Sequence, residues 1–210
     1  MKTKSLPPNA PTLIESTRAI GYTLEAAIAD IVDNSISALA SHIDIFFFPV
    51  GESYIAIVDD GCGMDANALE TAMRYGSQNP NEKREANDLG RFGLGLKTAS
   101  LSQCRILTVV SKQGSCIEAR RWDIDYVIET NDWSLLVFDS EEEIDAIPQI
   151  EELRKLKSGT LVVWQNLDRL KVGTLDFNRS MGKKLDDVRN HLSLVFHRYI
   201  CGEPGIKKMI

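Results

Sequence analysis

The sequence has few cysteines and histidines, and none of them forms a metal-binding or disulfide motif. It holds four cysteines and three histidines in 210 residues. The cysteines are widely spaced with no C-x-x-C pair, which favours reduced thiols over a zinc site or a disulfide framework. His191 and His197 are six residues apart in a segment of helical character, and that spacing does not bring two ligands onto one helix face. We therefore expect no metal site built from histidine or cysteine.

Long apolar runs and an excess of positive charge are also missing. The longest apolar run, residues 45–50, is far too short to cross a bilayer, and the polar start of the chain does not resemble a secretion signal. The formal net charge of −6 does not indicate a surface that binds nucleic acid. Hydrophobic residues make up 43% and charged residues 26% of the chain, as in globular proteins. We expect a cytoplasmic globular protein with no membrane association.

Hydrophobic periodicity predicts groups of strands that alternate with helices. Residues 1–20, with prolines at 7, 8 and 11, are predicted to form an irregular N-terminal arm. Predicted helices cover 24–40, 65–75, 95–103, 147–156 and 185–199, and predicted strands cover 43–48, 54–58, 105–111, 116–123, 135–139 and 160–165. This order indicates an α+β fold: a two-layer sandwich with a mostly antiparallel mixed sheet and helices on one face.

A polar stripe on the predicted helix 24–40 is the first candidate for chemistry. Asp30 and Asn34 are four residues apart, and Asp33 and Ser37 lie within roughly 60° of them around the helix. A solvated outer face would give the same pattern. In a cleft, the carboxylate and amide oxygens could instead hold a hydrated Mg²⁺ and an attacking water.

A turn with two glycines follows the strand 54–58. Asp59 stands where this strand ends and opens the segment Asp-Asp-Gly-Cys-Gly-Met, residues 59–64. The glycines permit a sharp turn and a close approach to a planar ligand. The carboxylate can accept a hydrogen bond from an exocyclic amino group, such as that of adenine. An ordinary Asp-Gly turn is the alternative.

A second glycine cluster lies at residues 90–98, with the pattern G-x-x-G-x-G-L-K-T at a predicted helix start. Bare backbone amides at such a position form a cradle for phosphate. The cluster is not a Walker A loop, because Leu96 separates Gly95 from Lys97, and Thr98 breaks the dinucleotide-binding pattern. The polar stretch 76–90 before it predicts a functional flap or a disordered insert.

The order and intervals of these segments resemble the GHKL superfamily, which includes gyrase, MutL, heat-shock chaperone ATPases, MORC proteins and histidine kinases. A helix with D-x-x-x-N, then D-x-G-x-G after a strand, a polar lid and G-x-x-G-x-G match its motifs. A fourth match is Ser158-Gly159-Thr160, where the superfamily places a threonine that contacts adenine. The resemblance spans about residues 20–167, and residues 90–100 are most similar to MORC and its bacterial relatives.

The resemblance implies a role for each matching residue. Asn34 corresponds to the Mg²⁺-binding asparagine, and Asp30 to the general base, where the superfamily mostly has glutamate. Asp59 and Thr160 correspond to the adenine contacts. The remaining implied nucleotide-binding residues belong to the two glycine segments: Gly61, Gly63 and Met64 in the first, and Phe92, Gly93, Leu94, Gly95, Leu96 and Lys97 in the second.

The implied function is Mg-dependent ATP binding with slow hydrolysis to ADP, which drives closure of the lid 76–90 and dimerisation. Slow turnover is expected because Asp30 is shorter than glutamate and because switch ATPases draw a further lysine from a following domain. A histidine-kinase catalytic domain and a degenerate nucleotide-binding scaffold are the alternatives. The predicted organisation is an arm at 1–20, an ATP-binding domain at 21–180, and a helix at 181–210 that leads into a following domain cut short here.

Overall fold

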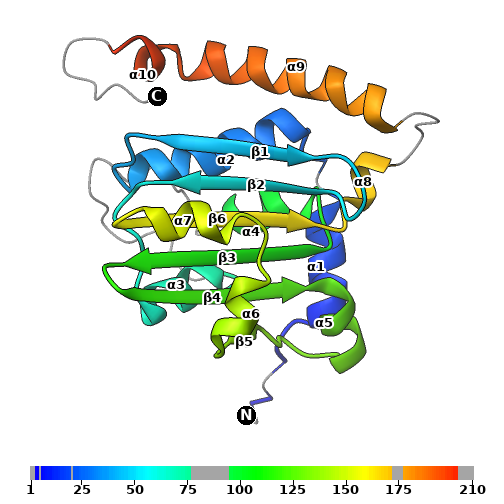
Figure 1. Cartoon of the computed structure of the whole chain (residues 1–210). Helices are drawn as coiled ribbons and strands as arrows, with labels where there is room; N and C mark the ends of the chain where they lie inside the picture. The colour runs from blue at the N-terminus through cyan, green and yellow to red at the C-terminus, as the bar shows by residue number, and fades with distance from the viewer. Residues whose placement is uncertain (1–2, 5, 20, 77–94, 172–176, 203–210) are drawn as a thin grey trace.

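A computed structural model describes residues 3–4, 6–19, 21–76, 95–171 and 177–202. One sheet runs through the molecule, with α1 to α4 behind it and α6 and α7 in front (Figure 1). The helices are α1 (Ala10–Arg18), α2 (Leu24–Ser37), α3 (Ala66–Met73), α4 (Gly95–Leu101), α5 (Ile124–Thr130), α6 (Glu141–Asp145), α7 (Ile150–Lys155), α8 (Asp168–Lys171), α9 (Phe177–Val195) and α10 (His197–Cys201). The strands are β1 (Ile43–Phe48), β2 (Tyr54–Asp59), β3 (Ile106–Gln113), β4 (Cys116–Asp123), β5 (Leu136–Phe138) and β6 (Ser158–Gln165).

The six strands of the described residues form one sheet in the order β1-β2-β6-β3-β4-β5, and each of their pairings is antiparallel. The last strand in sequence, β6, inserts between β2 and β3, so the late Ser158-Gly159-Thr160 segment lies beside the early Asp59. The α+β sandwich is therefore confirmed.

The main core lies between the sheet and the helices behind it. Alternate residues of the central strands point to this side, among them Ile55 and Ile57 of β2 and Trp164 of β6. They pack against the buried face of α2, where Ile28 is fully buried. The period-two pattern of the strands and the helical pattern of α2 thus bury their apolar sides against each other.

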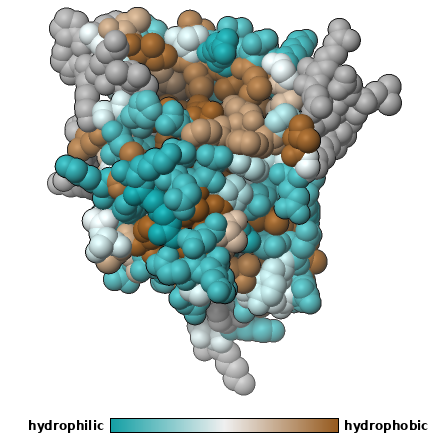
Figure 2. Space-filling view, viewed as in Figure 1, coloured by the Kyte–Doolittle hydropathy of each residue, from teal (hydrophilic) through white to brown (hydrophobic). Residues whose placement is uncertain are grey.

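The opposite face of the sheet is also partly covered. Ile144, Ile147, Ile150 and Leu153 of the α6–α7 region form a second core with the front of the central strands. The prediction of helices on one face thus holds for α1 to α4 but not for α6 and α7. Helix α6 begins at a capping box in which the Ser140 hydroxyl and the Glu143 side chain bind each other's backbone amides. Figure 2 shows an uncovered apolar band on this face, over β1 and β2 below α9.

The prediction of an irregular N-terminal arm is wrong for residues 10–18, which form helix α1. Asn9 caps this helix by accepting from the Thr12 amide, and Pro11 stands in its first turn. Both residue types also mark loops, which is why the sequence reading missed the helix. Ile14 is fully buried in the main core.

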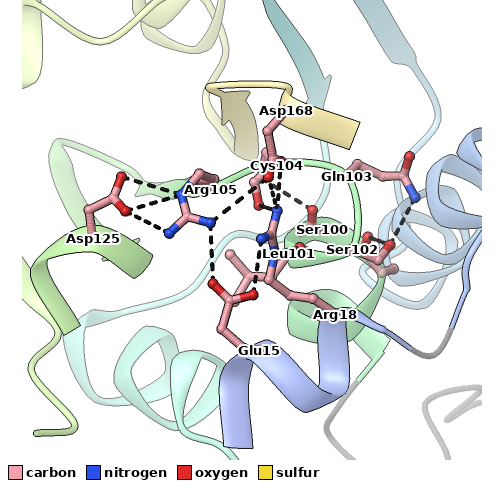
Figure 3. Close-up of polar contacts among 11 residues, drawn as sticks. Glu15, Arg18, Ser100, Leu101, Ser102, Gln103, Cys104, Arg105, Asp125 and Asp168 are labelled. Carbon is pink, nitrogen blue, oxygen red and sulfur yellow. Dashed lines mark hydrogen bonds and ion pairs between the residues drawn. The ribbon is translucent and has the colours of Figure 1, made fainter. Parts of the chain in front are cut away.

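Ion pairs and hydrogen bonds of a buried arginine connect the end of α1 to the rest of the domain (Figure 3). The Arg18 side chain is 2% exposed and donates to Asp168 at 2.6 and 2.8 Å. It also donates to the Leu101 carbonyl at 2.7 Å. Arg105 joins the same cluster through Glu15 and Asp125. These contacts connect α1 with the end of α4, with α5 and with α8.

The remaining differences concern which helices are present and where they begin and end. Helix α5 was not predicted, and the predicted helix 147–156 is the shorter α7, preceded by α6. Helix α9 begins at Phe177 rather than at 185. Within the described residues, no helix combines the length and apolarity that crossing a membrane would need.

Candidate nucleotide-binding site

A buried carboxylate at the end of β2 forms the centre of the candidate site. Asp59 is 5% exposed. Its Oδ2 accepts from the Ser35 hydroxyl at 2.8 Å, and its Oδ1 accepts from the Gly61 amide at 2.9 Å. Burial raises the pKa of Asp59, and the hydrogen bonds from Gly61 and Ser35 oppose that rise by stabilising the charged form.

Three neighbouring strands place polar side chains next to one another at this point. Asp59 of β2 pairs with Thr160 of β6, which in turn pairs with Ser111 of β3. All three share the face of the main core, and all three are buried. The Ser111 hydroxyl accepts from the Met64 amide at 2.7 Å and donates to the Gly159 carbonyl at 3.2 Å. The register of the sheet therefore pairs Asp59 with Thr160, which are 101 positions apart in the chain.

The turn after Asp59 requires its glycines. A Cβ at Gly61 would lie 2.8 Å from the Asp59 Oδ1 and 2.9 Å from Ala38 at the end of α2. Gly63 has a φ of +67°, and a Cβ there would overlap the Lys112 carbonyl oxygen. A side chain at either position would push the turn away from β3 or α2. The two glycines therefore hold this turn close to Asp59.

The polar stripe of α2 faces the start of α4. Asp30 and Asp33 are half-buried, whereas Asn34 is exposed. Burial raises the pKa of both carboxyls, and the charge of Asp30 raises that of Asp33 further. A Cβ at Gly95 would lie 3.8 Å from the Asp30 Oδ2. The predicted base and the last glycine of the second cluster are thus adjacent.

Lys97 points away from solvent. Its side chain is 1% exposed, and its Nζ donates to the Ala72 carbonyl at 2.6 Å. Burial lowers the pKa of this amine to about 8. This contact joins α4 to the last turn of α3, four residues before Gly76.

Several predicted positions lie outside the described residues. These are Phe92, Gly93, Leu94 and the predicted lid beyond Gly76. Two residues of the site were missed by sequence reasoning, namely the Ser35 and Ser111 hydroxyls. Ser35 stands on the apolar side of α2, and a polar residue at such a position is the one signal that could have pointed to it.

Comparison with known proteins agrees with this arrangement. A family model described as "Histidine kinase-, DNA gyrase B-, and HSP90-like ATPase" matches residues 22–160. The chain belongs to this family. It therefore carries a GHKL-type ATP-binding domain, and the matched range runs from Tyr22, just before α2, to Thr160 in β6.

Individual relatives come from the MutL and MORC groups of the GHKL family. The DNA mismatch repair protein MutL of Paramagnetospirillum magneticum is 39% identical over 66 residues, which cover 30% of this chain and 11% of that protein. The ATPase morc-1 of Caenorhabditis elegans is 32% identical over 95 residues, 45% of this chain and 11% of that protein. MutL of Rhodospirillum rubrum is 29% identical over 113 residues, 52% of this chain and 18% of that protein. The chain thus spans less than a fifth of these relatives.

Proposed function

We propose that this domain binds Mg-ATP and hydrolyses it slowly to ADP and phosphate. The observation that carries the proposal is the Asp59 carboxylate, buried at a sheet end beside a turn that needs glycine. Burying a charged carboxylate lowers the stability of the fold. Carboxyls with a pKa shifted in this way are found preferentially at functional sites. Asp30, Asn34 and Gly95 stand nearby on α2 and α4, where phosphate chemistry would take place in a GHKL-type site.

The Asp59 carboxylate can accept a further hydrogen bond. A carboxylate offers about four acceptor positions, and Ser35 and Gly61 occupy two of them. The adenine amino group is a donor of the right kind for one of the remaining positions. The Thr160 hydroxyl, on the neighbouring strand, is the second proposed contact with the base.

The residues present also suit a magnesium ion that is held mainly by the nucleotide. Within the described part of the chain, no group of three or more His, Cys, Asp or Glu residues is placed to hold a metal. Mg²⁺ at phosphate sites commonly takes only one or two protein oxygens and completes its shell with phosphates and water. The exposed carboxamide of Asn34 can supply one such oxygen. When bound, the ion would neutralise phosphate charge.

Asp30 is the proposed general base. In hydrolysis the water oxygen bonds to the γ-phosphorus, the bond from that phosphorus to the bridging oxygen breaks, and ADP leaves. The water proton goes to the Asp30 carboxylate, whose raised pKa favours accepting it. The second glycine cluster, through Gly95 and the backbone amide of Leu96, is proposed to contact the phosphates. Lys97 would have to leave the Ala72 carbonyl to contribute its charge there.

Closure of the segment 76–90 and ATP-dependent pairing of two copies remain part of the proposal. Both follow from the GHKL relationship, in which nucleotide commonly acts as a switch. The relatives are much longer than this chain, so these steps are proposed for the domain in its natural context.

Calorimetry and phosphate release test the proposal together. Wild-type protein is expected to bind ATP in the presence of Mg²⁺, and Asp59→Asn to bind it about ten- to a hundredfold more weakly, because a charge-assisted hydrogen bond is worth about 1.5–3 kcal/mol. Asp44→Asn, at an exposed position of β1, is the matched control. Asp30→Asn should retain binding and lose phosphate release. Equal ATP affinity in Asp59→Asn and wild type would refute the base-binding assignment, whereas binding without any turnover would favour the scaffold alternative.

A further inference from the structure

Asp60 directly follows Asp59 in the chain, but its side chain binds a different segment. It is half-buried, and its Oδ1 accepts from the backbone amides of Ser41 and His42 at 2.6 and 2.9 Å. Its Oδ2 accepts from the Ser41 hydroxyl at 2.6 Å. The Asp60 amide in turn donates to the His42 carbonyl at 3.2 Å. Four hydrogen bonds thus join Asp60 to the short connection between α2 and β1.

This connection begins with a strained backbone conformation. Leu39 directly follows the C-cap of α2, Ala38, and has a φ of 62°. A leucine in this left-handed region costs free energy that a glycine would not. Such conformations persist only where surrounding contacts hold them. Besides Asp60, the Cys62 amide provides such a contact, because it donates to the Ala38 carbonyl at 2.9 Å.

The two segments that Asp60 joins belong to different halves of the proposed site. Helix α2 carries Asp30 and Asn34, which are proposed to act at the phosphates. The turn at residues 59–64 begins with Asp59, the proposed contact with the base. Hydrogen bonds to a charged carboxylate are about twice as strong as those between neutral groups. The contacts of Asp60 therefore determine where the turn lies relative to the end of α2.

We propose that Asp60 is a positioning residue, which fixes the turn at residues 59–64 against the end of α2 before the nucleotide binds. This inference rests on the proposed function, because it assigns Asp60 a part in ATP binding. Asp60 does not touch the nucleotide in this proposal and acts through the placement of Asp59. A site that is ordered in advance binds more tightly, since binding need not order it. The effect of Asp60 should therefore fall on ATP affinity and leave the rate at saturating ATP unchanged.

The kinetic test compares three substitutions with wild type at a temperature where all variants are folded. Asp60→Ala should raise KM and the dissociation constant for Mg-ATP by about tenfold, while kcat stays within about twofold. Asp60→Asn should restore most of the affinity, because a carboxamide oxygen can accept from the same two amides. Ser41→Ala removes only the hydroxyl bond and should raise KM by about two- to threefold.

Two results of this series would overturn the proposal. An affinity as low in Asp60→Asn as in Asp60→Ala would attribute the loss to the charge of residue 60 rather than to its hydrogen bonds. A wild-type KM in Ser41→Ala would show that the contact with residue 41 does not support binding. The second result decides the question even if Asp60→Ala does not fold.

Asp123→Ala is the matched control, and it separates positioning from a loss of stability. The Asp123 side chain caps α5 by accepting from the amides of Asp125 and Tyr126 at 3.0 and 3.3 Å. Asp123 lies at the end of β4 that is remote from Ser111. Its loss should lower Tm, as the loss of an N-cap does, and leave KM within about twofold. A tenfold rise of KM in Asp123→Ala would show that lower stability alone weakens ATP binding, and it would overturn the role of Asp60.

Hydrogen exchange measured by NMR tests the same joint without nucleotide. The Cys62 amide is bonded to the Ala38 carbonyl, so its exchange rate reports whether the turn stays against α2. In nucleotide-free protein this amide should exchange about tenfold faster in Asp60→Ala than in wild type, and at the wild-type rate in Asp123→Ala. An unchanged rate in Asp60→Ala would show that the turn is held without Asp60 and overturn the inference.

The outcomes separate this inference from the proposed function. If wild type binds Mg-ATP and Asp59→Asn binds it weakly, the proposed contact with the base stands, and an unchanged affinity in Asp60→Ala overturns only the role of Asp60. A fall of kcat in Asp60→Ala without a change of KM also overturns that role, since it would place Asp60 in hydrolysis. If wild type does not bind Mg-ATP, the proposed function and the positioning role fail together, whatever the exchange rates show.

Discussion

The substitution Asp59→Asn should separate stability from ATP binding. Burial raises the pKa of Asp59 above its ordinary value of 3.8, so the folded state disfavours the charged form that is present at neutral pH. For a carboxyl with a raised pKa in the folded state, the stability it contributes is fully present below about pH 3.8 and is lost as pH rises through the folded-state pKa. At neutral pH the charge of Asp59 therefore lowers the free energy of unfolding, and removing it should not destabilise the protein.

The hydrogen bonds around Asp59 permit this replacement. An asparagine carboxamide can keep the bond from the Gly61 amide at its oxygen and donate from its nitrogen to Ser35. The Ser35 hydroxyl can then give its own hydrogen to the Ile31 carbonyl, which already lies 3.3 Å away. With these bonds kept, we expect the unfolding free energy at pH 7.5 to be unchanged or higher by up to about 1 kcal/mol. For a chain of this size that is a rise in Tm of up to about 4 °C.

The assay is thermal unfolding of wild type and Asp59→Asn without nucleotide at pH 7.5 and at pH 4.5, followed by calorimetry with Mg-ATP. Any gain in the Tm of Asp59→Asn over wild type should be smaller at pH 4.5, where more of the wild-type carboxyl is protonated. The ATP affinity should fall by about ten- to a hundredfold. A Tm several degrees below wild type at pH 7.5 would refute the reasoning, because it would show that the carboxylate serves stability rather than ligand binding.

Three further substitutions test separate parts of the structure. Asn34→Ala should abolish the Mg-dependent part of ATP binding in calorimetry and leave Tm unchanged, since Asn34 is exposed; an unfolded variant or normal Mg-ATP binding would contradict its role. Lys97→Met removes a buried amine whose pKa is lowered from 10.5 to about 8, so wild-type stability should rise relative to the variant between about pH 8 and 10.5, as measured by urea unfolding; a difference that does not vary with pH would contradict this. Arg18→Met should lower the unfolding free energy by about 2–4 kcal/mol, because Arg18 is buried while its partner Asp168 is partly solvated; Arg169→Met, at an exposed position, is the control and should change little.

The sequence predicts the elements with a simple period well. The strands β1, β2, β4 and β6 and the helix α2 begin where apolar periodicity starts, to within two residues. Helix α1 was missed because Asn9 and Pro11 are signals shared by helix starts and loops, and its buried side, with Ile14 and Arg18, is recognisable only when the rest of the core is present. Local signals thus identify elements whose burial pattern is regular, and they fail where tertiary contacts determine whether a segment forms a helix.

The same distinction applies to the site. Asp59, Gly61 and Gly63 could be predicted because one short motif contains them. Ser111 is too far along the chain for any local pattern, and it joins the site only because β6 inserts between β2 and β3. Such contacts depend on strand order, which local sequence does not determine.

The two halves of the proposed site are built on different supports, and this difference predicts how substitutions in each half should behave. Asp59, Thr160 and Ser111 stand on three hydrogen-bonded strands, so their spacing is fixed by the sheet register. Asp30, Asn34 and Gly95 stand on α2 and on the start of α4, two helices that pack against each other and bring Asp30 beside Gly95. Helices packed on a sheet can shift by small amounts that hydrogen-bonded strands cannot. Changes on the strand side should therefore act on nucleotide affinity, and changes that loosen α2 from α4 should act first on the rate of hydrolysis.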